Sequence, residues 1–500
     1  MDYILEPSLI FAYNQSAKDP RDGITLFGPF DHNRLIGMKT IGIIGPEHLR
    51  IKMKDYLKKI HSCIINQKDL ARPDYPGLQA AFGISINFLN IQEINISSES
   101  IENNLNNKDE YQRVHNLSNL YVERLIEYKE KYEMPVDIWF IVIPEAIYRF
   151  GRPRSQIPYS ANTYNDGIPI KNRFSDESFL FDYMQQRYAT LMKAYEYKVN
   201  FHNQIKAKIL PYSIATQIIR ESKITFNNSL IKSQIEYERK SETSKAWNIS
   251  TALYYKLGGL PWRLKDVRKG VCYLGLVYNK TSPGEESTNA CCAAQMFLDD
   301  GDGMIFRGNV GPWLNPETKE FHLDKKSAID IISQALKMYY DRFSQYPSEL
   351  FIHAKTFFDD IEWSGFTEAI GDNKSKLVGV RISGSTPFKL YRQGNFCVPR
   401  GTILQYGRNK AFLWTKGYIP RLQNQIGLET PNPLDIRITH GETDIKIVCR
   451  DILSLSKLNY NTCMYGDGLP ITLKFANSIG EILTTGKDVK SGILPFRYYI

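Results

Sequence analysis

Four polar residues near the middle of the chain have the types needed to hold a phosphate-like anion. His202 and Lys206 are four residues apart, so on a helix they share one face. Gln217 follows Lys206 by eleven residues, and Lys256 lies near the end of a predicted helix, Trp247–Leu257. Two cations, an imidazole and an amide suit a terminal phosphate, which carries about two negative charges and several acceptor oxygens. Each of the four alone is typical of an exposed helix, so the prediction depends on their joint order.

A second set of positions is informative because it lacks carboxylates. The second half of the chain has the element order of an RNase H-like nuclease, and a two-metal nuclease needs several Asp or Glu side chains converging on its ions. The corresponding positions here are Val277, Ala354 or Lys355, and Asn477. Acids nearby are placed elsewhere, with Asp299, Asp300 and Asp302 in a predicted hairpin turn and Asp359 and Asp360 beyond the fourth strand. The sequence therefore predicts an RNase H-like fold without cutting chemistry.

The elements that must position these residues follow from hydrophobic patterning. In the first half, near-continuous apolar strands alternate with helices, which is typical of a buried parallel sheet in a Rossmann-like α/β domain. A Gly pair and a Pro at 258–261 predict a boundary, giving domains 1–260 and 261–500. The predicted strands are Lys39–Ile44, Val136–Ile143, Gly270–Tyr278, Asn289–Asp299, Gly303–Gly311 and Glu349–Lys355, and the predicted helices are Glu47–Ile60, Asp109–Tyr132, Ser327–Phe343 and Pro470–Leu483.

Three polar stretches interrupt this pattern. Ile96–Glu110 is predicted to be a surface excursion, Ser155–Asp176 a loop, and Phe226–Ala246 a mobile loop. The spacing of Gly42 and Gly45 is not that of GxGxxG, so a dinucleotide-binding metabolic enzyme is disfavoured.

Bulk properties set wider limits. The chain has 500 residues and a formal net charge of +9, from 63 Lys and Arg against 54 Asp and Glu, which allows a basic groove without requiring one. The seven cysteines form no CxxC pair, and the first residues lack a signal-peptide pattern. No stretch approaches 18 apolar residues, so we expect a cytoplasmic protein with reduced thiols and no membrane span.

Taken with these motifs, the whole chain resembles the short prokaryotic Argonautes, which consist of MID and PIWI domains. The resemblance rests on the opening Glu6-Pro7 with Asp19–Gly23, on His202 and Lys206, and on the matching runs that follow. These runs are Val136–Pro144, Thr216–Ser222, Tyr255–Gly259, Gly270–Tyr278, Ala290–Asp299, Gly311–Trp313, Phe475–Leu483 and Phe496–Ile500. The match is closest to members that act with a TIR-APAZ partner.

The resemblance implies roles for individual residues. His202, Lys206, Gln217 and Lys256 fall on the motif that anchors the 5′ phosphate of a guide strand, with His202 where many relatives carry Tyr. It also implies a Mg²⁺ ion beside that phosphate, held by Gln217 and the terminal carboxylate of Ile500; the alternative is that Ile500 only ends a packed strand. The cations Arg152, Arg154 and Arg220 are expected to contact the guide, although a solvated basic loop is an equally simple interpretation for the first two.

The implied function is that of a guide-loaded sensor without catalysis of its own. It would bind a 5′-phosphorylated guide RNA, pair it with complementary single-stranded DNA, and form a heterodimer with an APAZ-containing protein. That partner would carry a TIR effector, with a sirtuin-type or nuclease effector as alternatives, and would degrade NAD after assembly into a higher oligomer. The rival hypothesis from another class is an active guide-directed DNA endonuclease.

Overall fold

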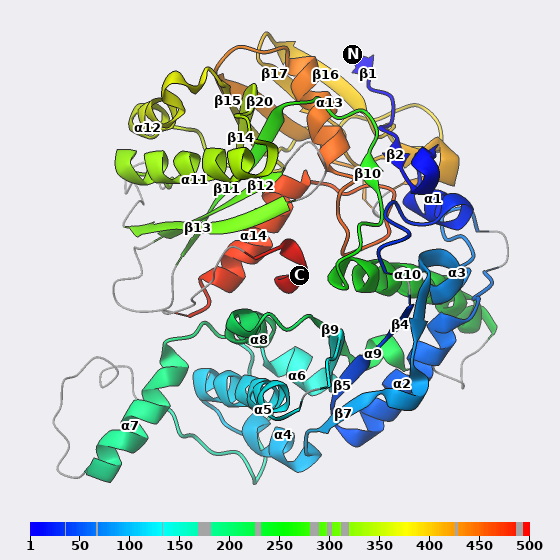
Figure 1. Ribbon diagram of the computed structural model, residues 1–500, viewed down its shortest axis with the longest axis vertical. Coiled ribbons are helices and arrows are strands. Elements are labelled where there is room, and N and C mark those ends of the chain that lie inside the picture. The colour runs from blue at the N-terminus through cyan, green and yellow to red at the C-terminus, as the bar shows by residue number, and fades with distance from the viewer. Residues whose placement is uncertain are drawn as a thin grey trace.

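Two β-sheets organise the molecule, one in each half of the chain (Figure 1). The computed structural model describes residues 1–35, 37–66, 69–132, 134–168, 182–225, 232–280, 290–297, 303–311, 320–425, 429–486 and 494–500. The predicted turn acids Asp299, Asp300 and Asp302 lie outside this described part.

The first sheet has four parallel strands in the order β7-β5-β8-β9. Their bounds are Gln92–Asn95, Ile41–Gly45, Ile138–Ile143 and Thr216–Arg220. Successive side chains of β5 and β8 enter different cores: Ile43 and Phe140 join one apolar cluster, and Ile44 and Ile141 join another. This alternation buries both faces, as the near-continuous apolar strands predict.

Helices cover both faces of this sheet. One face carries α2, whose residues Leu49, Met53 and Leu57 pack into the first cluster. The other face carries α5 and α8, which contribute Leu117, Tyr121 and Ile205 to the second. The helices of this half are α1 (Pro20–Phe27), α2 (Glu47–His61), α3 (Leu78–Phe82), α4 (Ser98–Leu105), α5 (Glu110–Lys131), α6 (Glu145–Phe150), α7 (Asp182–Tyr195), α8 (Phe201–Ile209), α9 (Glu221–Ile224) and α10 (Lys232–Lys256).

Two polar stretches are more regular than their composition suggests. The predicted mobile loop Phe226–Ala246 is wrong from Lys232 onward, because these residues form the first part of α10. The segment contains no Gly or Pro, and its end is anchored by the buried Thr243 and Ala246. Within the predicted surface excursion Ile96–Glu110, α4 forms because Ser97 caps it and Ile101 is buried.

The second sheet has nine strands in the order β1-β16-β17-β20-β15-β14-β11-β12-β13. Strand β11 (Val271–Lys280) pairs antiparallel with β12 (Ala290–Phe297) and parallel with β14 (Glu349–Ala354). Strands β12 and β13 (Gly303–Gly311) pair antiparallel from Phe297 opposite Gly303, which confirms the predicted hairpin pairing. The remaining strands are β1 (Asp2–Tyr3), β15 (Lys376–Ser383), β16 (Thr402–Gly407), β17 (Lys410–Leu413) and β20 (Leu434–His440).

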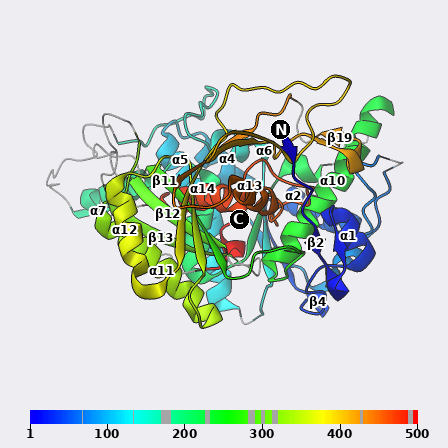
Figure 2. The same ribbon diagram turned by 90° about the horizontal axis from the view of Figure 1, so that it is seen from above.

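Opposite faces of this sheet carry different helices. Helices α11 (Lys325–Phe343) and α12 (Asp360–Ile370) lie on one face, and α14 (Ile471–Leu483) lies on the other (Figure 2). Helix α14 comes very close to β11, because a Cβ added at Gly275 would lie 2.2 Å from the carbonyl oxygen of Thr472. A residue without a side chain is therefore required at 275. Helix α13 (Ile445–Leu455) also packs in this half.

Short strands and the chain ends connect the halves. Strand β2 (Leu9–Ile10) pairs with β10 (Arg263–Leu264) and with β3 (Ser16–Ala17), so residues of the first half lie against the second. The last residues return to the middle of the molecule, beside α8 (Figure 1). The remaining small pairs join β4 (Gly37–Lys39) to β6 (Ile84–Ile86) and β18 (Tyr418–Ile419) to β19 (Asn424–Gln425). The division at 260/261 stays a prediction.

None of the helices that the structure describes has both the length and the apolar character needed to cross a bilayer.

A buried ionic cluster fixes the opening segment. Glu6 accepts hydrogen bonds from Arg400 Nε at 2.9 Å and from Lys457 Nζ at 2.7 Å, and all three side chains are buried. Burial alone would raise the pKa of Glu6, but the two cations outweigh it and hold that pKa below its ordinary value. The carboxylate is thus ionised at neutral pH, and its one negative charge is shared between two buried cations.

Glu6→Gln should lower the free energy of unfolding by about 3–5 kcal/mol at pH 7, because it leaves Arg400 and Lys457 without their counter-charge. Urea unfolding followed by circular dichroism measures this. Since the pKa of Glu6 is lowered on folding, the wild-type advantage should be full above the ordinary glutamate pKa and shrink as the pH falls below it.

Glu127→Gln is the matched control. Glu127 also contacts two cations, Arg124 and Lys131, but on an exposed helix surface, so little change is expected. Equal effects of the two substitutions would contradict a special role for the buried cluster.

Candidate nucleic-acid interface

Helix α8 brings two of the predicted anion ligands to the junction of the two halves. Asn200 caps this helix, its Oδ1 accepting from the backbone N of Asn203 at 3.1 Å. Lys206 is 1% exposed, and its Nζ donates to the main-chain oxygens of Thr216 at 3.0 Å and Ile500 at 2.7 Å. His202 lies one turn earlier, at the solvent-exposed end of the helix.

Lys256, at the end of α10, donates to the same carbonyl oxygen as Lys206. Its Nζ donates to the carbonyl oxygen of Thr216 at 3.0 Å and to Oε1 of Gln217 at 2.6 Å. Gly258 ends the helix two residues later with φ of 97°, a conformation that favours glycine. The two lysines thus share one carbonyl acceptor, and the structure brings Lys206, Gln217 and Lys256 together as predicted.

The electrostatics of this cluster are unusual. In the described part of the chain, neither lysine has an Asp or Glu side chain as a hydrogen-bond or ion-pair partner. Burial lowers the pKa of Lys206 to about 7, and burial together with the nearby Lys206 lowers the pKa of Lys256 well below its ordinary value. Both shifts have the sign expected for ammonium groups that are removed from water.

A cavity of about 710 Å³ opens next to Gln217, the acceptor of Lys256, while Lys206 and Lys256 themselves are not among its lining residues. His202 and Gln217 line it, so they face the space where a ligand would lie. Burial of the ring and, to a smaller extent, Lys206 lower the pKa of His202, although the residue as a whole is exposed to solvent. Other lining residues are Ile143, Ile147, Tyr148, Arg152, Phe201, Arg220, Lys223, Lys245 and Asn248.

An aromatic ring organises the predicted basic contacts. The guanidinium carbon of Arg152 lies 3.7 Å from the ring centroid of Tyr148, and that of Arg220 lies 4.3 Å from it. Arg220 also meets Glu145 at 3.5 Å. The two arginines are therefore held at the cavity by the same ring. Tyr148 was not among the residues predicted for the site.

Arg154 is not at the cavity. It has φ of 61°, and its backbone N donates to Oε2 of Glu110 at 2.8 Å. Among the described residues that line the cavity, Lys223 and Lys245 supply additional cations instead.

Of the positions expected to replace the catalytic carboxylates, Val277, Lys355 and Asn477 lie on the α14 side of the second sheet, whereas Ala354, the alternative to Lys355, lies in the cluster on the α11–α12 side. Lys355 Nζ donates to Oδ1 of Asn477 at 3.4 Å, and Val277 is 5% exposed in the apolar cluster that includes α14. His353 is buried nearby, with Nδ1 3.0 Å from Oγ1 of Thr472. A cation and an amide thus face each other here.

The two predicted Mg²⁺ ligands are oxygen donors, the type that Mg²⁺ prefers. In this structure Oε1 of Gln217 accepts from Lys256, and the main-chain oxygen of Ile500 accepts from Lys206. An ion held by both would need these oxygens to turn from their lysine partners.

Comparison with known proteins gives one curated sequence relative and many structural ones. No family model matches the chain. Protein argonaute of Aquifex aeolicus (strain VF5) is 20% identical over 332 residues, which are 64% of this chain and 40% of that protein. The chain therefore spans about two fifths of this relative's length.

Solved structures extend the similarity over the whole chain. Clostridium butyricum Argonaute bound to a guide DNA and a 19-mer target DNA gives a TM-score of 0.64 at 17% identity, covering 100% of this chain and 54% of that one. A. aeolicus Argonaute with externally bound siRNA gives 0.60 at 15% identity, covering 100% and 56%. Drosophila Piwi gives 0.54 at 13% identity, covering 99% and 56%. The chain therefore has the mixed α/β fold of Argonaute proteins, which supports the resemblance that its motifs indicate.

Proposed function

We propose that this chain is a guide-binding Argonaute-type protein in which the two buried lysines and Gln217 hold the 5′ phosphate of the guide. The observation that carries the proposal is the convergence of Lys206 and Lys256 on the carbonyl oxygen of Thr216, next to a cavity lined by His202 and Gln217.

Charge balance favours a phosphate ligand. A buried ammonium group is costly unless an anion or a set of hydrogen-bond acceptors compensates it. The acceptors described here are neutral carbonyl and amide oxygens together with the main-chain oxygen of Ile500. A terminal phosphate would bring about two negative charges to the two buried lysines and favour their protonated forms, and its oxygens would accept charge-assisted hydrogen bonds.

The cavity suits the first nucleotide beyond that phosphate. Arg152 and Arg220 lie on the ring of Tyr148 at its wall, and guanidinium and aromatic planes both stack on splayed-out bases. His202, neutral before binding, can donate one hydrogen bond to a phosphate oxygen. Such contacts fix the position of a strand without reading its sequence, so base pairing between guide and target would supply specificity.

The domain assignments in this proposal rest on the topology of the two sheets. We assign residues 1–260 to a Rossmann-like MID domain and residues 261–500 to an RNase H-like PIWI domain. The parallel four-stranded sheet supports the first assignment, and the β13-β12-β11-β14-β15 order of the second sheet supports the other. A Mg²⁺ ion at Gln217 and Ile500 remains part of the proposal, and when bound it would supply positive charge beside the phosphate.

We further propose that the chain does not cleave its target. Lys355 and Asn477 face each other where carboxylates would have to converge, and a buried valine occupies position 277. The expected output is therefore signalling. Guide RNA and single-stranded DNA would assemble on a cytoplasmic heterodimer with an APAZ-containing partner, whose TIR effector would deplete NAD after further oligomerisation. Sirtuin-type or nuclease effectors are the alternatives, and this part rests on resemblance alone.

Changing Lys206 and Gln217 together to Ala should abolish the preference for 5′-phosphorylated over 5′-hydroxyl guide RNA. Each lost hydrogen bond to a charged group is worth about 1.5–3 kcal/mol, so the phosphorylated guide should bind at least about tenfold more weakly. Fluorescence anisotropy with both guides measures the preference. Lys58→Ala, on the exposed surface of α2, is the control and should keep it. An unchanged preference in a folded double variant would refute the pocket assignment.

The preference for a 5′ phosphate should also fall as the pH rises above 7. Lys206 has a pKa of about 7 in this structure, and a bound phosphate would raise it, so binding takes up a proton. A guide phosphate is already close to a dianion in this range. One linked proton weakens binding by up to about tenfold per pH unit. Titrations at pH 7, 8 and 9 should show this slope for the phosphorylated guide only; equal slopes for the hydroxyl guide would contradict the linkage.

Asn477→Asp should not create a nuclease. The new carboxylate would lie beside Lys355 and pair with it, and one carboxylate cannot hold two metal ions. Incubation of the wild type and the variant with guide, labelled target and Mn²⁺, followed by denaturing gel electrophoresis, should give no product. Cleavage by the wild type would instead favour the rival hypothesis of an active endonuclease.

A further inference from the structure

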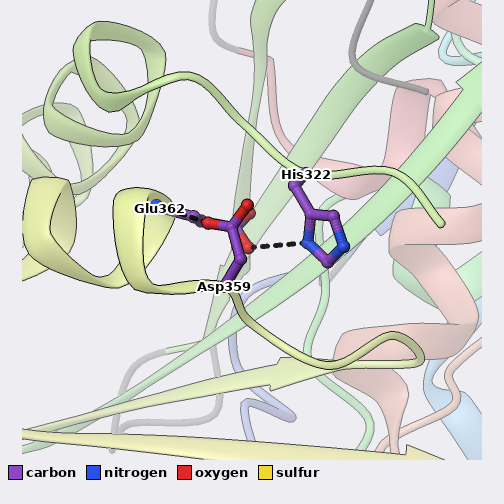
Figure 3. A group of neighbouring side chains, drawn as sticks. All are labelled: His322, Asp359 and Glu362. Atoms are coloured by element: carbon purple, nitrogen blue, oxygen red, sulfur yellow. Dashed lines mark hydrogen bonds and ion pairs between the residues drawn. The ribbon is translucent and has the colours of Figure 1, made fainter. Parts of the chain in front are cut away.

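A cluster of ligand-type side chains lies on the α11–α12 side of the second sheet, opposite α14. His322 precedes α11, Asp359 caps α12, and Glu362 lies in the first turn of α12 (Figure 3). One potential ligand atom from each of these residues lies within 4.8 Å of the others. The proposed guide pocket uses none of them.

Glu362 has one oxygen engaged and one available. Its side chain is 1% exposed, and Oε1 accepts from the hydroxyl of Tyr278 and from the backbone N of Leu323. Oε2 is buried and has no hydrogen-bond partner among the residues that the structure describes. An ionised buried carboxylate oxygen in this position requires a cation or a proton.

His322 supplies the second group. Its Nδ1 lies 3.6 Å from Oε2 of Glu362, beyond hydrogen-bond distance. That separation is close to the ~3.4 Å expected between two ligands of a tetrahedral ion with bonds of about 2.1 Å. Its Nε2 lies 3.7 Å from Oε2 of Glu320, so a second carboxylate can orient the ring from behind, as carboxylates commonly do for metal-bound histidines.

Asp359 supplies the third potential ligand and also caps α12. Its Oδ1 accepts from the backbone N of Glu362 at 2.7 Å and so caps α12. Both Asp359 and His322 are partly exposed, so an ion can reach the cluster from solvent.

We propose that His322, Asp359 and Glu362 bind one divalent transition-metal ion of the Zn²⁺ class. An imidazole with two carboxylates suits Zn²⁺ or Co²⁺, whereas Mg²⁺ and Ca²⁺ favour oxygen-only sites. The ion ties the segment before α11 to the start of α12. The proposal is independent of guide binding.

The competing explanation is a protonated His322 paired with Glu362. The carboxylate raises the pKa of His322, which favours the proton, and a metal ion would have to displace that proton from the ring. Metal binding separates the two explanations, because a proton-only pair would not retain Co²⁺.

Co²⁺ titration of the untagged full chain, stripped with a chelator, tests the site. The expected result is one bound Co²⁺ per chain with the visible absorption of nitrogen and oxygen ligands, displaced by Zn²⁺. His322→Ala and Glu362→Gln should abolish it, and Asp359→Asn, which keeps a capping side chain, should weaken affinity at least about tenfold. His48→Ala, on the exposed surface of α2, is the matched control and should leave it unchanged.

A second measurement distinguishes loss of the metal site from loss of folding in the variants. Zn²⁺ should raise the thermal unfolding temperature of the wild type and of His48→Ala but not that of folded Asp359→Asn at the same concentration. Absence of bound Co²⁺, or equal Co²⁺ spectra and equal Zn²⁺ stabilisation in all variants, would overturn the proposal.

Discussion

Two buried lysines share one carbonyl oxygen as acceptor, and the arrangement of the molecule depends most on this interaction. Lys206 comes from α8, Lys256 from the end of α10, and Thr216 from β9. The main-chain oxygen of Ile500 joins them from the other end of the sequence. Lys206 therefore has its acceptors only when α8, β9 and the final residues are in place, and Lys256 has its acceptors only when α10 and β9 are in place. Such a cluster stabilises the protein poorly when no anion is present, which is typical of sites organised for a ligand.

Several contacts near this cluster hold the two halves in register. Lys198 donates through its backbone N to the carbonyl oxygen of Thr485 at 2.7 Å and through Nζ to Oγ1 of Thr484 at 2.7 Å. These bonds connect the start of α8 to the end of α14. Because α14 packs directly on β11 at Gly275, movement of the anion site would be transmitted to the centre of the second sheet. The proposed sensor could use this connection, since guide binding and the surface that receives a duplex share one packed unit.

Much of this could be predicted from the sequence because it depends on local rules. Apolar runs identified β5 and β8 of the first sheet and β11, β12, β13 and β14 of the second, but not the other strands, and the i, i+4 spacing placed His202 and Lys206 on one helix. Other features depend on tertiary contacts that no spacing encodes. The common acceptor at Thr216 is a backbone oxygen, so its residue type carries no signal. The stacking of Arg152 and Arg220 on Tyr148, and the meeting of His322 with Glu362, join segments that are distant in sequence. Lys232–Ala246 was misjudged because a polar segment without Gly or Pro forms a helix as readily as a loop.

The placement of the opening segment has a consequence for how the protein is made. Glu6 is 394 positions away from Arg400, and Asp2 pairs with Ile403 in the second sheet. On a ribosome adding about 5–20 residues per second, the segment waits roughly 20–80 seconds for these partners. During that time the partners that Glu6 and β1 have in the folded protein have not yet been synthesised. Newly synthesised molecules should therefore depend on chaperones more than a chain of this size with neighbouring contacts would.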